Sequence, residues 1–267
     1  MTYCSTETLN KAQKKIVAHK NGPALVIAGA GSGKTRVITH RVAQLIHSGV
    51  PASSILLLTF TNKAADEMTQ RVGKAINNTT DQNKIIHGTF HSVGNRFLRQ
   101  HAKLLDYKNN FSILDTSDSK DMIKAAIAET MGKPGKFFPK AAVLQNIFSL
   151  AFNRNGTQKM ILALPYQKRN FQLDQLIYSD YPHFEEYLET MIKILATYRK
   201  KKKRGQVMDF DDLLENWLEL LVVHGEDLPL CRQINHILVD EYQDTNKVQA
   251  EILLLLSRQQ NNLMVVG

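Results

Sequence analysis

The residue types best suited to chemistry occur in a glycine-rich stretch near the start of the chain. Glycines alternate with small residues and are followed at once by Lys34 and Thr35. Such glycines let the backbone curl so that successive N–H groups face a phosphate, the lysine adds a positive charge, and the threonine hydroxyl can bind Mg²⁺. A flexible loop before a helix is the alternative, but the apolar run before the stretch and the helical pattern after it favour a phosphate-binding loop. The residues of this loop are Ala28, Gly29, Ala30, Gly31, Ser32, Gly33, Lys34 and Thr35.

A second group of reactive side chains follows an apolar run much later in the chain. Asp240 and Glu241 come directly after residues 237–239, which read Ile-Leu-Val. In hydrolases with a phosphate-binding loop, an aspartate at this position holds Mg²⁺ and a neighbouring glutamate orients or deprotonates water. The alternative is a strand that ends in solvent-facing acids. The upstream loop favours the catalytic interpretation, because parallel strands would place both motifs at the same edge of a sheet.

Alternating strand and helix patterns lead to these motifs. Short apolar runs alternate with helical periodicity, which predicts βαβ units and a parallel sheet with helices on both faces. From about residue 115 to 204 the alternation fails and mostly helical patterns follow one another. We therefore expect an α/β fold with an inserted all-helical subdomain. The expected strands are 24–28, 55–60, 84–87, 234–240 and 263–266, and the expected helices are 8–20, 35–47, 62–76, 89–105, 119–131, 140–153, 172–178, 183–200, 210–223 and 247–257.

Composition narrows the class of protein. The chain has 267 residues and a net charge of +9, and 43% of its residues are apolar, which is typical of a globular protein. Residues 109–204 hold 16 Lys and Arg against 9 Asp and Glu, and this excess suits a polyanionic partner such as nucleic acid. The apolar runs are too short to span a bilayer, the first residues show no signal peptide, and two cysteines predict neither a disulfide framework nor a zinc site. We expect a cytoplasmic protein.

Six ordered motifs resemble those of superfamily 1 DNA helicases of the UvrD/Rep/PcrA type. The most specific is residues 240–246, Asp-Glu-Tyr-Gln-Asp-Thr-Asn, which resembles the DExQDTN box of the family. Residues 28–36 resemble its nucleotide loop, which itself begins with alanine. The other matching stretches are 9–13, 59–65, 88–91 and 208–214. The resemblance covers nearly the whole chain and is weak across 109–204.

The resemblance implies ATP and Mg²⁺ as ligands and gives the matching residues roles at one nucleotide site. Lys34 and the loop amides would bind phosphate, Glu241 would be the base for the attacking water, and Gln243 would link the nucleotide to the DNA side. The remaining residues of the implied site are Gln13 for adenine, Thr35 and Asp240 for Mg²⁺, and Arg36 at the end of the nucleotide loop.

The resemblance also implies single-stranded DNA as a partner, together with junctions between duplex and single strand. The loop after the second strand would face DNA, with an aromatic ring for base stacking and polar groups for phosphates. A second and weaker set of candidates follows the third strand. The implied DNA-binding residues are Phe60, Thr61, Asn62, Lys63, Thr89, Phe90 and His91.

The family organisation implies a RecA-like ATP-binding domain made of residues 1–108 and 205–267, interrupted by a helical subdomain at 109–204. A second RecA-like domain, which supplies arginine fingers in the family, would lie in the full protein, so this piece alone would be weakly active or inactive. The implied activity is ATP-driven 3′–5′ movement along single-stranded DNA in repair or replication. Two alternatives stay open, the helicase part of a RecB/AddA-like recombination complex and a non-enzymatic fragment that binds DNA or a partner.

Three features of the sequence allow more than one interpretation. Residues 200–204, a run of Lys and Arg, could follow a phosphate backbone, but a solvated linker is favoured. Asp209 could support the site from a distance or be the N-cap of a helix that starts at Phe210. Trp217 belongs to a stripe of leucines at helical spacing and is expected in a core.

Overall fold

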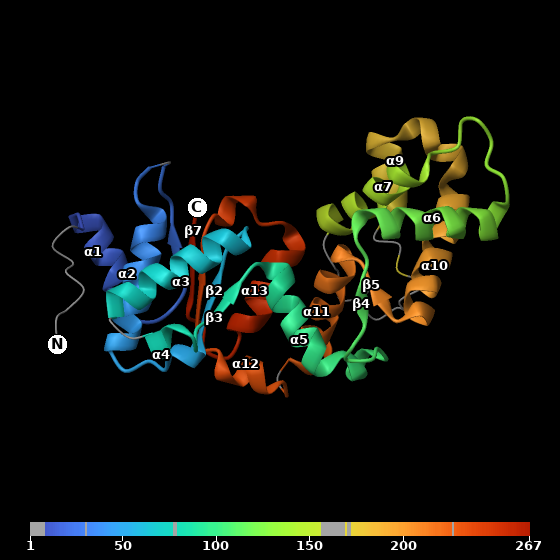
Figure 1. The fold of residues 1–267 in the computed structure, drawn as a ribbon. Helices are drawn as coiled ribbons and strands as arrows, with labels where there is room; N and C mark the ends of the chain where they lie inside the picture. Colours follow the sequence, from blue (N-terminus) through green and yellow to red (C-terminus); the bar gives the residue numbers. More distant parts are fainter. Residues whose placement is uncertain (1–8, 30, 77–78, 156–168, 170–171, 226) are drawn as a thin grey trace. The chain divides into compact units, whose positions relative to one another are not determined.

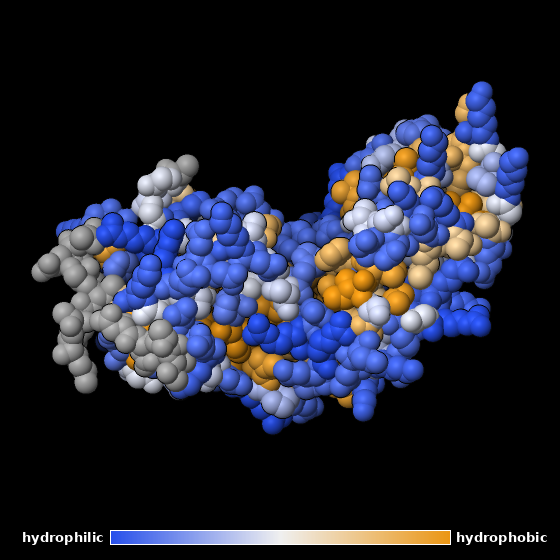
Figure 2. Space-filling view, viewed as in Figure 1, coloured by the Kyte–Doolittle hydropathy of each residue, from blue (hydrophilic) through white to orange (hydrophobic). Residues whose placement is uncertain are grey.

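The computed structural model describes residues 9–29, 31–76, 79–155, 169, 172–225 and 227–267. The chain divides into two units. Unit 1 comprises residues 1–94, 224–245 and 252–267, and unit 2 comprises residues 95–223 and 246–251. Within the described residues, every helix is too short or too polar to cross a membrane. Figure 2 shows that hydrophilic residues cover most of one face and that apolar residues gather there in a few patches.

A five-stranded parallel sheet forms the centre of unit 1, in the order β1-β7-β6-β2-β3 (Figure 1). The central strands β2 and β6 are buried along their whole length, as expected where helices cover both faces of a parallel sheet. The edge strand β1 differs, because Leu25 on it is 65% exposed. The strands are β1 (Ala24–Val26), β2 (Ile55–Leu58), β3 (Ile86–Gly88), β6 (His236–Val239) and β7 (Leu263–Val266).

Helices α2 and α3 cover one face of this sheet. Their apolar sides form a common core with the strands, in which Ile38 of α2, Met68 of α3 and Leu57 of β2 are each fully buried. This packing fixes the start of α2, and with it the glycine-rich loop, against the end of β1. The helices that lie wholly in unit 1 are α1 (Lys11–Val17), α2 (Lys34–His47), the short helix η2 (Ala52–Ser54), α3 (Asn62–Ile76), α4 (Thr79–Gln82), α12 (Pro229–Gln233) and the short helix η6 (Tyr242–Asp244).

Unit 2 is mainly helical. Its core includes Trp217, which is fully buried as expected and has its ring centroid 5.3 Å from that of Phe97. A short parallel ladder of two strands, which the sequence pattern did not predict, joins residues 112–113 to residues 207–208. The elements here are η3 (Ala102–Leu105), β4 (Ser112–Ile113), α6 (Thr116–Met131), α7 (Ala141–Asn155), α9 (Leu173–Asp180), η5 (Pro182–Tyr187), α10 (Leu188–Gly205) and β5 (Val207–Met208). Three helices are divided between the two units, namely α5 (Phe90–His101), α11 (Phe210–His224, of which only the last residue is in unit 1) and α13 (Lys247–Ser257).

The predicted fold class is confirmed. The chain is α/β, with an all-parallel sheet flanked by helices and a further group of helices between the motif-bearing segments. All five expected strands are present, so the ends of β1 and β6, where the two candidate motifs begin, lie at the same edge of one sheet.

Candidate active site

The glycine-rich loop leads from β1 into the first turn of α2. Gly31 and Gly33 have φ angles of 74° and 86°, a left-handed conformation that side chains other than glycine seldom adopt. α2 begins at Lys34, and the backbone N–H groups of its first turn have no partners within the helix. A Cβ placed on Gly29 or Gly31 would meet no atom within 4 Å, so open space lies in front of the loop. This is the geometry of an anion cradle at a helix N-terminus. Ala30 of the predicted loop lies outside the described residues.

A hydrogen bond joins this loop to the acidic motif. The Oγ1 of Thr35, in the first turn of α2, donates to Oδ2 of Asp240 at 3.0 Å, across 205 positions of the chain. Asp240 follows the last residue of β6 and is 3% exposed. Burial raises the pKa of its carboxyl group, and the hydrogen bond from Thr35 opposes that rise. The structure therefore brings together the two side chains predicted to hold Mg²⁺.

An ion pair makes a second connection between the two motifs. Nζ of Lys34 lies 3.2 Å from Oε2 of Glu241, and the same oxygen accepts a hydrogen bond of 2.6 Å from Nε2 of Gln243. These contacts from Gln243 and Lys34 hold the pKa of Glu241 below its ordinary value. The side chain of Glu241 is 40% exposed and that of Lys34 is 15% exposed, so both can exchange partners with solvent or a ligand. Glu241 itself has a φ of 55°, which turns the chain sharply after β6.

The end of β7 completes the arrangement at this edge of the sheet. The N–H of Ala28 donates to the carbonyl of Gly267 at 2.9 Å, and the N–H of Gly267 donates to the carbonyl of Val26 at 3.0 Å. A Cβ on Gly267 would come within 2.8 Å of Oε1 of Gln243. The backbone of residue 267 thus contacts the start of the phosphate loop and lies beside Gln243 of the acidic loop.

Gln13 lies beside the same loop. Its Nε2 donates to the carbonyl of Ser32 at 2.9 Å, and its Oε1 accepts from the N–H of Asn10 in a reciprocal capping box at the start of α1. The buried side chain of Arg41 donates to the carbonyls of Val17 and Lys20, which fixes the other end of α1. The two contacts hold α1 against the nucleotide loop. Arg36, the last residue predicted for that loop, is exposed on α2.

The predicted DNA-binding residues follow two neighbouring strands. Thr61, Asn62 and Lys63 are exposed at the start of α3, and Phe60 is half-buried. The hydroxyl of Thr61 accepts from the N–H of Ala64 and so caps this helix. The three exposed side chains form a polar edge after β2.

The second set of predicted DNA-binding residues follows β3 and is divided by the fold. The N–H of Thr59 donates to the carbonyl of Gly88, so the two segments run side by side. Thr89 and His91 are half-buried at the start of α5. Phe90, by contrast, is only 2% exposed, so its ring belongs to the core and is not placed with the surface residues. The alternation of an aromatic with polar residues did not reveal which side of the helix it faces.

The Lys and Arg run of residues 200–204 is not a linker. It forms the last turn of α10, and Nζ of Lys202 lies 2.6 Å from Oδ2 of Asp209 and 2.7 Å from Oδ2 of Asp212. Lys202 is 3% exposed. Asp209 is also an N-cap, because its Oδ1 accepts from the N–H of Asp212 while Asp212 accepts from the N–H of Asp209. The N-cap predicted as one alternative for Asp209 is therefore confirmed, and the same side chain also belongs to a buried ion cluster.

A second buried ion cluster was missed by the sequence analysis. Glu215 accepts hydrogen bonds from Arg169 at 3.0 Å and from both terminal nitrogens of Arg199, and all three side chains are less than 7% exposed. These partners lie far apart in the chain, and their residue types are common on helix surfaces. The spacing of Arg199 and Lys202, one turn apart on α10, is the only signal that could have indicated a shared buried face.

Comparison with known proteins identifies the family to which the chain is similar. The family model of the UvrD/REP helicase N-terminal domain matches residues 9–267. The ATP-dependent DNA helicase PcrA of Bacillus subtilis (strain 168) is 37% identical over 272 residues, which cover 100% of this chain and 34% of that protein. The proteins of the same name from Leuconostoc citreum and Staphylococcus aureus (strain Mu50) are each 34% identical, over 98% and 97% of this chain and 32% and 33% of their own lengths. The chain thus spans about a third of the length of these relatives.

Proposed function

This chain belongs to the family of the UvrD/REP helicase N-terminal domain, and from this premise we propose that it is the nucleotide-binding part of an ATP-dependent DNA helicase. The whole protein would move 3′–5′ along single-stranded DNA, act at junctions between single strand and duplex, and serve repair or replication. ATP with Mg²⁺ would bind at residues 28–36. The relatives named as ATP-dependent DNA helicases support the class of activity.

One observation carries this proposal. Two motifs about two hundred positions apart in the chain meet through two separate contacts, Thr35 with Asp240 and Lys34 with Glu241. A coincidence of two solvent-facing loops would not pair a buried carboxylate with the hydroxyl at the helix start and an exposed carboxylate with the adjacent lysine. The residues in these contacts are of the types that a phosphate-transfer site requires, because Thr35 and Asp240 would supply oxygen ligands and Lys34 a positive charge at one helix N-terminus.

The residues present fit a Mg²⁺–nucleotide complex. The hydroxyl of Thr35 and the carboxylate of Asp240 are oxygen ligands of the kind that Mg²⁺ prefers, and the loop amides with Lys34 would receive the phosphates. When bound, Mg²⁺ would neutralise charge on the phosphate oxygens. A phosphate at Lys34 competes with Glu241 for the same ammonium group, so nucleotide binding releases the Glu241 carboxylate. Gln243 then still holds that carboxylate, where it can accept a proton from the attacking water.

The remaining predicted residues extend this proposal to the base and to DNA. Gln13 would exchange its bond to Ser32 for adenine, and the exposed Arg36 would flank the nucleotide. Residues 60–63 would contact single-stranded DNA, with the half-buried ring of Phe60 available for a base on its exposed side. Thr89 and His91 would contribute from the neighbouring strand end, and Phe90 would support them from the core.

The proposed domain organisation follows the family. Residues 1–108 and 205–267 would form a RecA-like domain, with residues 109–204 as an inserted subdomain. Arginine fingers are worth about 10³–10⁵ in rate where a phosphate-transfer site depends on them. A partner RecA-like domain would supply them in the whole protein, so we expect slow turnover by this piece alone.

ATP turnover with and without single-stranded DNA tests the proposal, with Glu241→Gln beside the unchanged chain. We expect Mg²⁺-dependent binding of nucleotide and slow turnover that Glu241→Gln abolishes. Binding that needs no Mg²⁺ and survives Lys34→Met would contradict the site. Rapid DNA-stimulated turnover by the 267-residue chain would contradict the need for a second domain but not the site.

A further inference from the structure

The side-chain amide of Asn153, on α7 in unit 2, connects the acidic motif to the motif of residues 208–214, which has no role in the nucleotide site. Its Nδ2 donates to Oδ1 of Asp211 at 3.1 Å and to the carbonyl of Ser149 at 2.9 Å. Its Oδ1 accepts from Nδ2 of Asn246 at 2.7 Å. Asp211 belongs to the motif of residues 208–214, and Asn246 is the last residue of the acidic motif 240–246. One amide therefore joins both motifs in a relay, which we define as Asp211, Asn153 and Asn246.

This relay has a fixed direction. Oδ1 of Asn246 accepts from the N–H of Gln249 at 2.9 Å as the N-cap of α13, so only its Nδ2 is left to face Asn153. Asn153 must then present its oxygen to Asn246 and its nitrogen to the other side. The group at that other side must be an acceptor, and the carboxylate of Asp211 meets this requirement. The orientation of both amides follows from the helix cap rather than from a choice between equivalent flips.

The relay ends at the loop that carries the proposed catalytic residues. Asn246 follows Gln243 by three positions and Glu241 by five, and the chain passes from unit 1 to unit 2 between Thr245 and Asn246. The N–H of Asn246 donates to Oε1 of Gln249 at 3.1 Å, which closes a reciprocal capping box. The carbonyl of Asn246 also accepts from the N–H of Ala250, so four hydrogen bonds set the position of Asn246, and one of them comes from outside its own helix.

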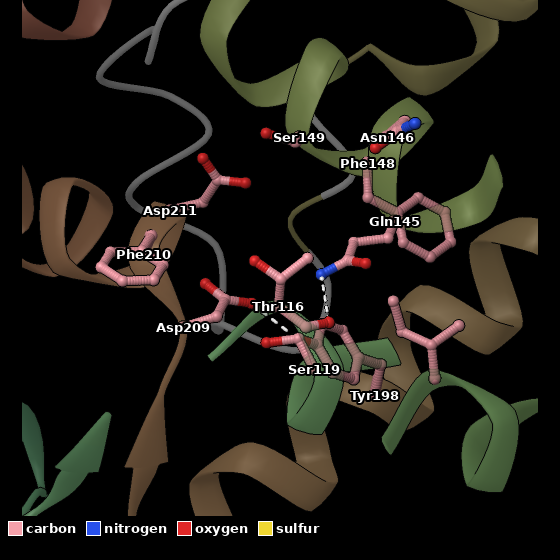
Figure 3. Close-up of a pocket in the computed structure, with 11 residues that line it drawn as sticks. Thr116, Ser119, Gln145, Asn146, Phe148, Ser149, Tyr198, Asp209, Phe210 and Asp211 are labelled. Carbon is pink, nitrogen blue, oxygen red and sulfur yellow. Dashed lines mark hydrogen bonds between the residues drawn. The ribbon is translucent and has the colours of Figure 1, made fainter. Parts of the chain in front are cut away.

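The other end of the relay lines a pocket. Asp211 and Ser149 are on the wall of a cavity of about 230 Å³ in unit 2. Figure 3 shows them on one side of that pocket, with Thr116, Ser119 and Tyr198 on the other. Burial and the nearby Asp209 raise the pKa of Asp211, and the hydrogen bonds from Ser149 and Asn153 oppose that rise. The acceptor of the relay is therefore held at the wall of a cavity.

We propose that Asn153 is a positioning residue, which acts through Asn246 to hold the end of the loop that carries Glu241 and Gln243. The relay fixes where α13 begins and so limits the conformations open to the residues between Glu241 and Asn246. The inference rests on the proposed function only for what the loop does. The relay itself can be tested without nucleotide.

Hydrogen exchange of the full 267-residue chain is the first test. Asn153→Ala should increase the exchange rates of the Asn246 and Gln249 amides by about tenfold, the effect of losing one well-formed hydrogen bond. Asn146→Ala is the matched control, because Asn146 is exposed on the same helix and outside the relay. Unchanged exchange at both amides in Asn153→Ala, with the fold intact by circular dichroism, would overturn the proposal.

Substitutions that exchange hydrogen-bond donors and acceptors in the relay distinguish its hydrogen bonds from an effect of packing alone. Asn246→Asp keeps an N-cap oxygen but sets a carboxylate against Oδ1 of Asn153, so exchange at Gln249 should rise about as much as in Asn153→Ala. Asp211→Asn alone should change little, because its amide oxygen can still accept. When the two substitutions are combined, the amide introduced by Asp211→Asn can donate, Asn153 can turn over, and part of the protection should return. A double variant as unprotected as Asn246→Asp would show that the three residues do not act as a relay.

Nucleotide assays then test what the relay does. If the proposed function holds, Asn153→Ala should lower the ATP turnover number about tenfold at an almost unchanged Kd for Mg²⁺–nucleotide, since Lys34 and the loop amides remain in place. Loss of affinity with an unchanged turnover number would contradict a role in positioning Glu241. A wild-type chain that binds no nucleotide would refute the proposed function and leave the exchange result standing.

Discussion

A lysine contacts carboxylates in each unit, and the two lysines differ mainly in their access to solvent. In unit 1 the side chain of Lys34 is 15% exposed and its partner Glu241 is 40% exposed, at an N–O distance of 3.2 Å. In unit 2 the side chain of Lys202 is 4% exposed, and its partners Asp209 and Asp212 are 14% and 2% exposed, at 2.6 and 2.7 Å. The first pair can open to a phosphate at little cost, while the second cannot open without stranding buried charge.

Burial of the charged groups, rather than residue type, separates the exchangeable pair in unit 1 from the structural cluster in unit 2. Both lysines contact an acidic residue next to a helix start, Glu241 before η6 and Asp209 before α11. The charged and neutral partners of the two pairs also differ. Glu241 shares its oxygen between Lys34 and the neutral Gln243, whereas Lys202 serves two carboxylates at once. Replacing the lysine by methionine should therefore weaken ligand binding in unit 1 and lower stability in unit 2.

Lys202→Met should have the largest effect on stability. Removal of the ammonium group leaves Asp209 and Asp212 buried beside each other, and loss of one partner of a buried ion pair costs about 3–5 kcal/mol. Urea unfolding followed by circular dichroism measures the change. Any Lys202→Met protein that remains folded at low urea should bind Mg²⁺–nucleotide as the unchanged chain does. A stability within about 0.5 kcal/mol of the unchanged chain would show that this cluster is not fixed.

Lys34→Met, the matched substitution in unit 1, should act on binding alone. We expect the Kd for a fluorescent Mg²⁺–ATP analogue to rise about 100-fold, because a charge-assisted contact to phosphate is lost. The free energy of unfolding should change by less than about 1 kcal/mol, since the ion pair with Glu241 is open to solvent. Equal losses of stability in the two lysine variants would remove the distinction between the units.

The pH dependence of stability should reveal the fixed cluster. Burial, with Asp209 beside it, raises the pKa of Asp212 to about 7. The folded chain then keeps this proton up to about pH 7 while the unfolded chain releases it near about pH 4, so stability falls as the pH rises between these values. Asp212→Asn has no such proton, and its unfolding free energy should decline less, by about 1–2 kcal/mol, from pH 5 to pH 8 in urea titrations. The same decline in both proteins would contradict the raised pKa.

Glu241→Gln should have the smallest of the four expected effects, and the property it changes is nucleotide binding. The variant lacks the carboxylate that competes with phosphate for Lys34, so the analogue should bind as tightly as to the unchanged chain or about threefold more tightly. Fluorescence titration at several salt concentrations measures this, because the competing ion pair weakens as salt rises. Markedly weaker binding would mean that Glu241 holds the ligand rather than Lys34.

Much of the fold could be predicted because the periodic segments are long. The helices at Asn62–Ile76 and Lys247–Ser257 and the strand at Leu263–Val266 have the predicted bounds, since each combines a clear apolar period with polar residues at its ends. The β4–β5 ladder could not be predicted, because strands of two residues carry no alternation. Tertiary pairing defines them, as in the bond from the N–H of Leu114 to the carbonyl of Met208.

The residues of the candidate site could be predicted from the sequence, but the burial of charged residues elsewhere in the chain could not. The loop of residues 28–36 and the pair Asp240 and Glu241 were found from local patterns, and the structure brings them together. The environment of Lys202 could not be found in this way, because a run of five basic residues is typical of a solvated surface. Its burial depends on Asp209 and Asp212, which come after the end of α10 and turn back toward it. Phe90 was misplaced for the same reason, since local sequence does not tell which side of α5 faces the core.

The most direct test of the central claim compares Asp240→Asn with the unchanged chain in titrations of a Mg²⁺–ATP analogue, each with and without Mg²⁺. If Thr35 and Asp240 form one site with the loop around Lys34, Mg²⁺ should strengthen binding to the unchanged chain and have little effect on the variant. Metal-free binding, which depends on Lys34 and the loop amides, should be similar in both. Equal strengthening by Mg²⁺ in Asp240→Asn would contradict the claim that the two motifs form a single nucleotide site.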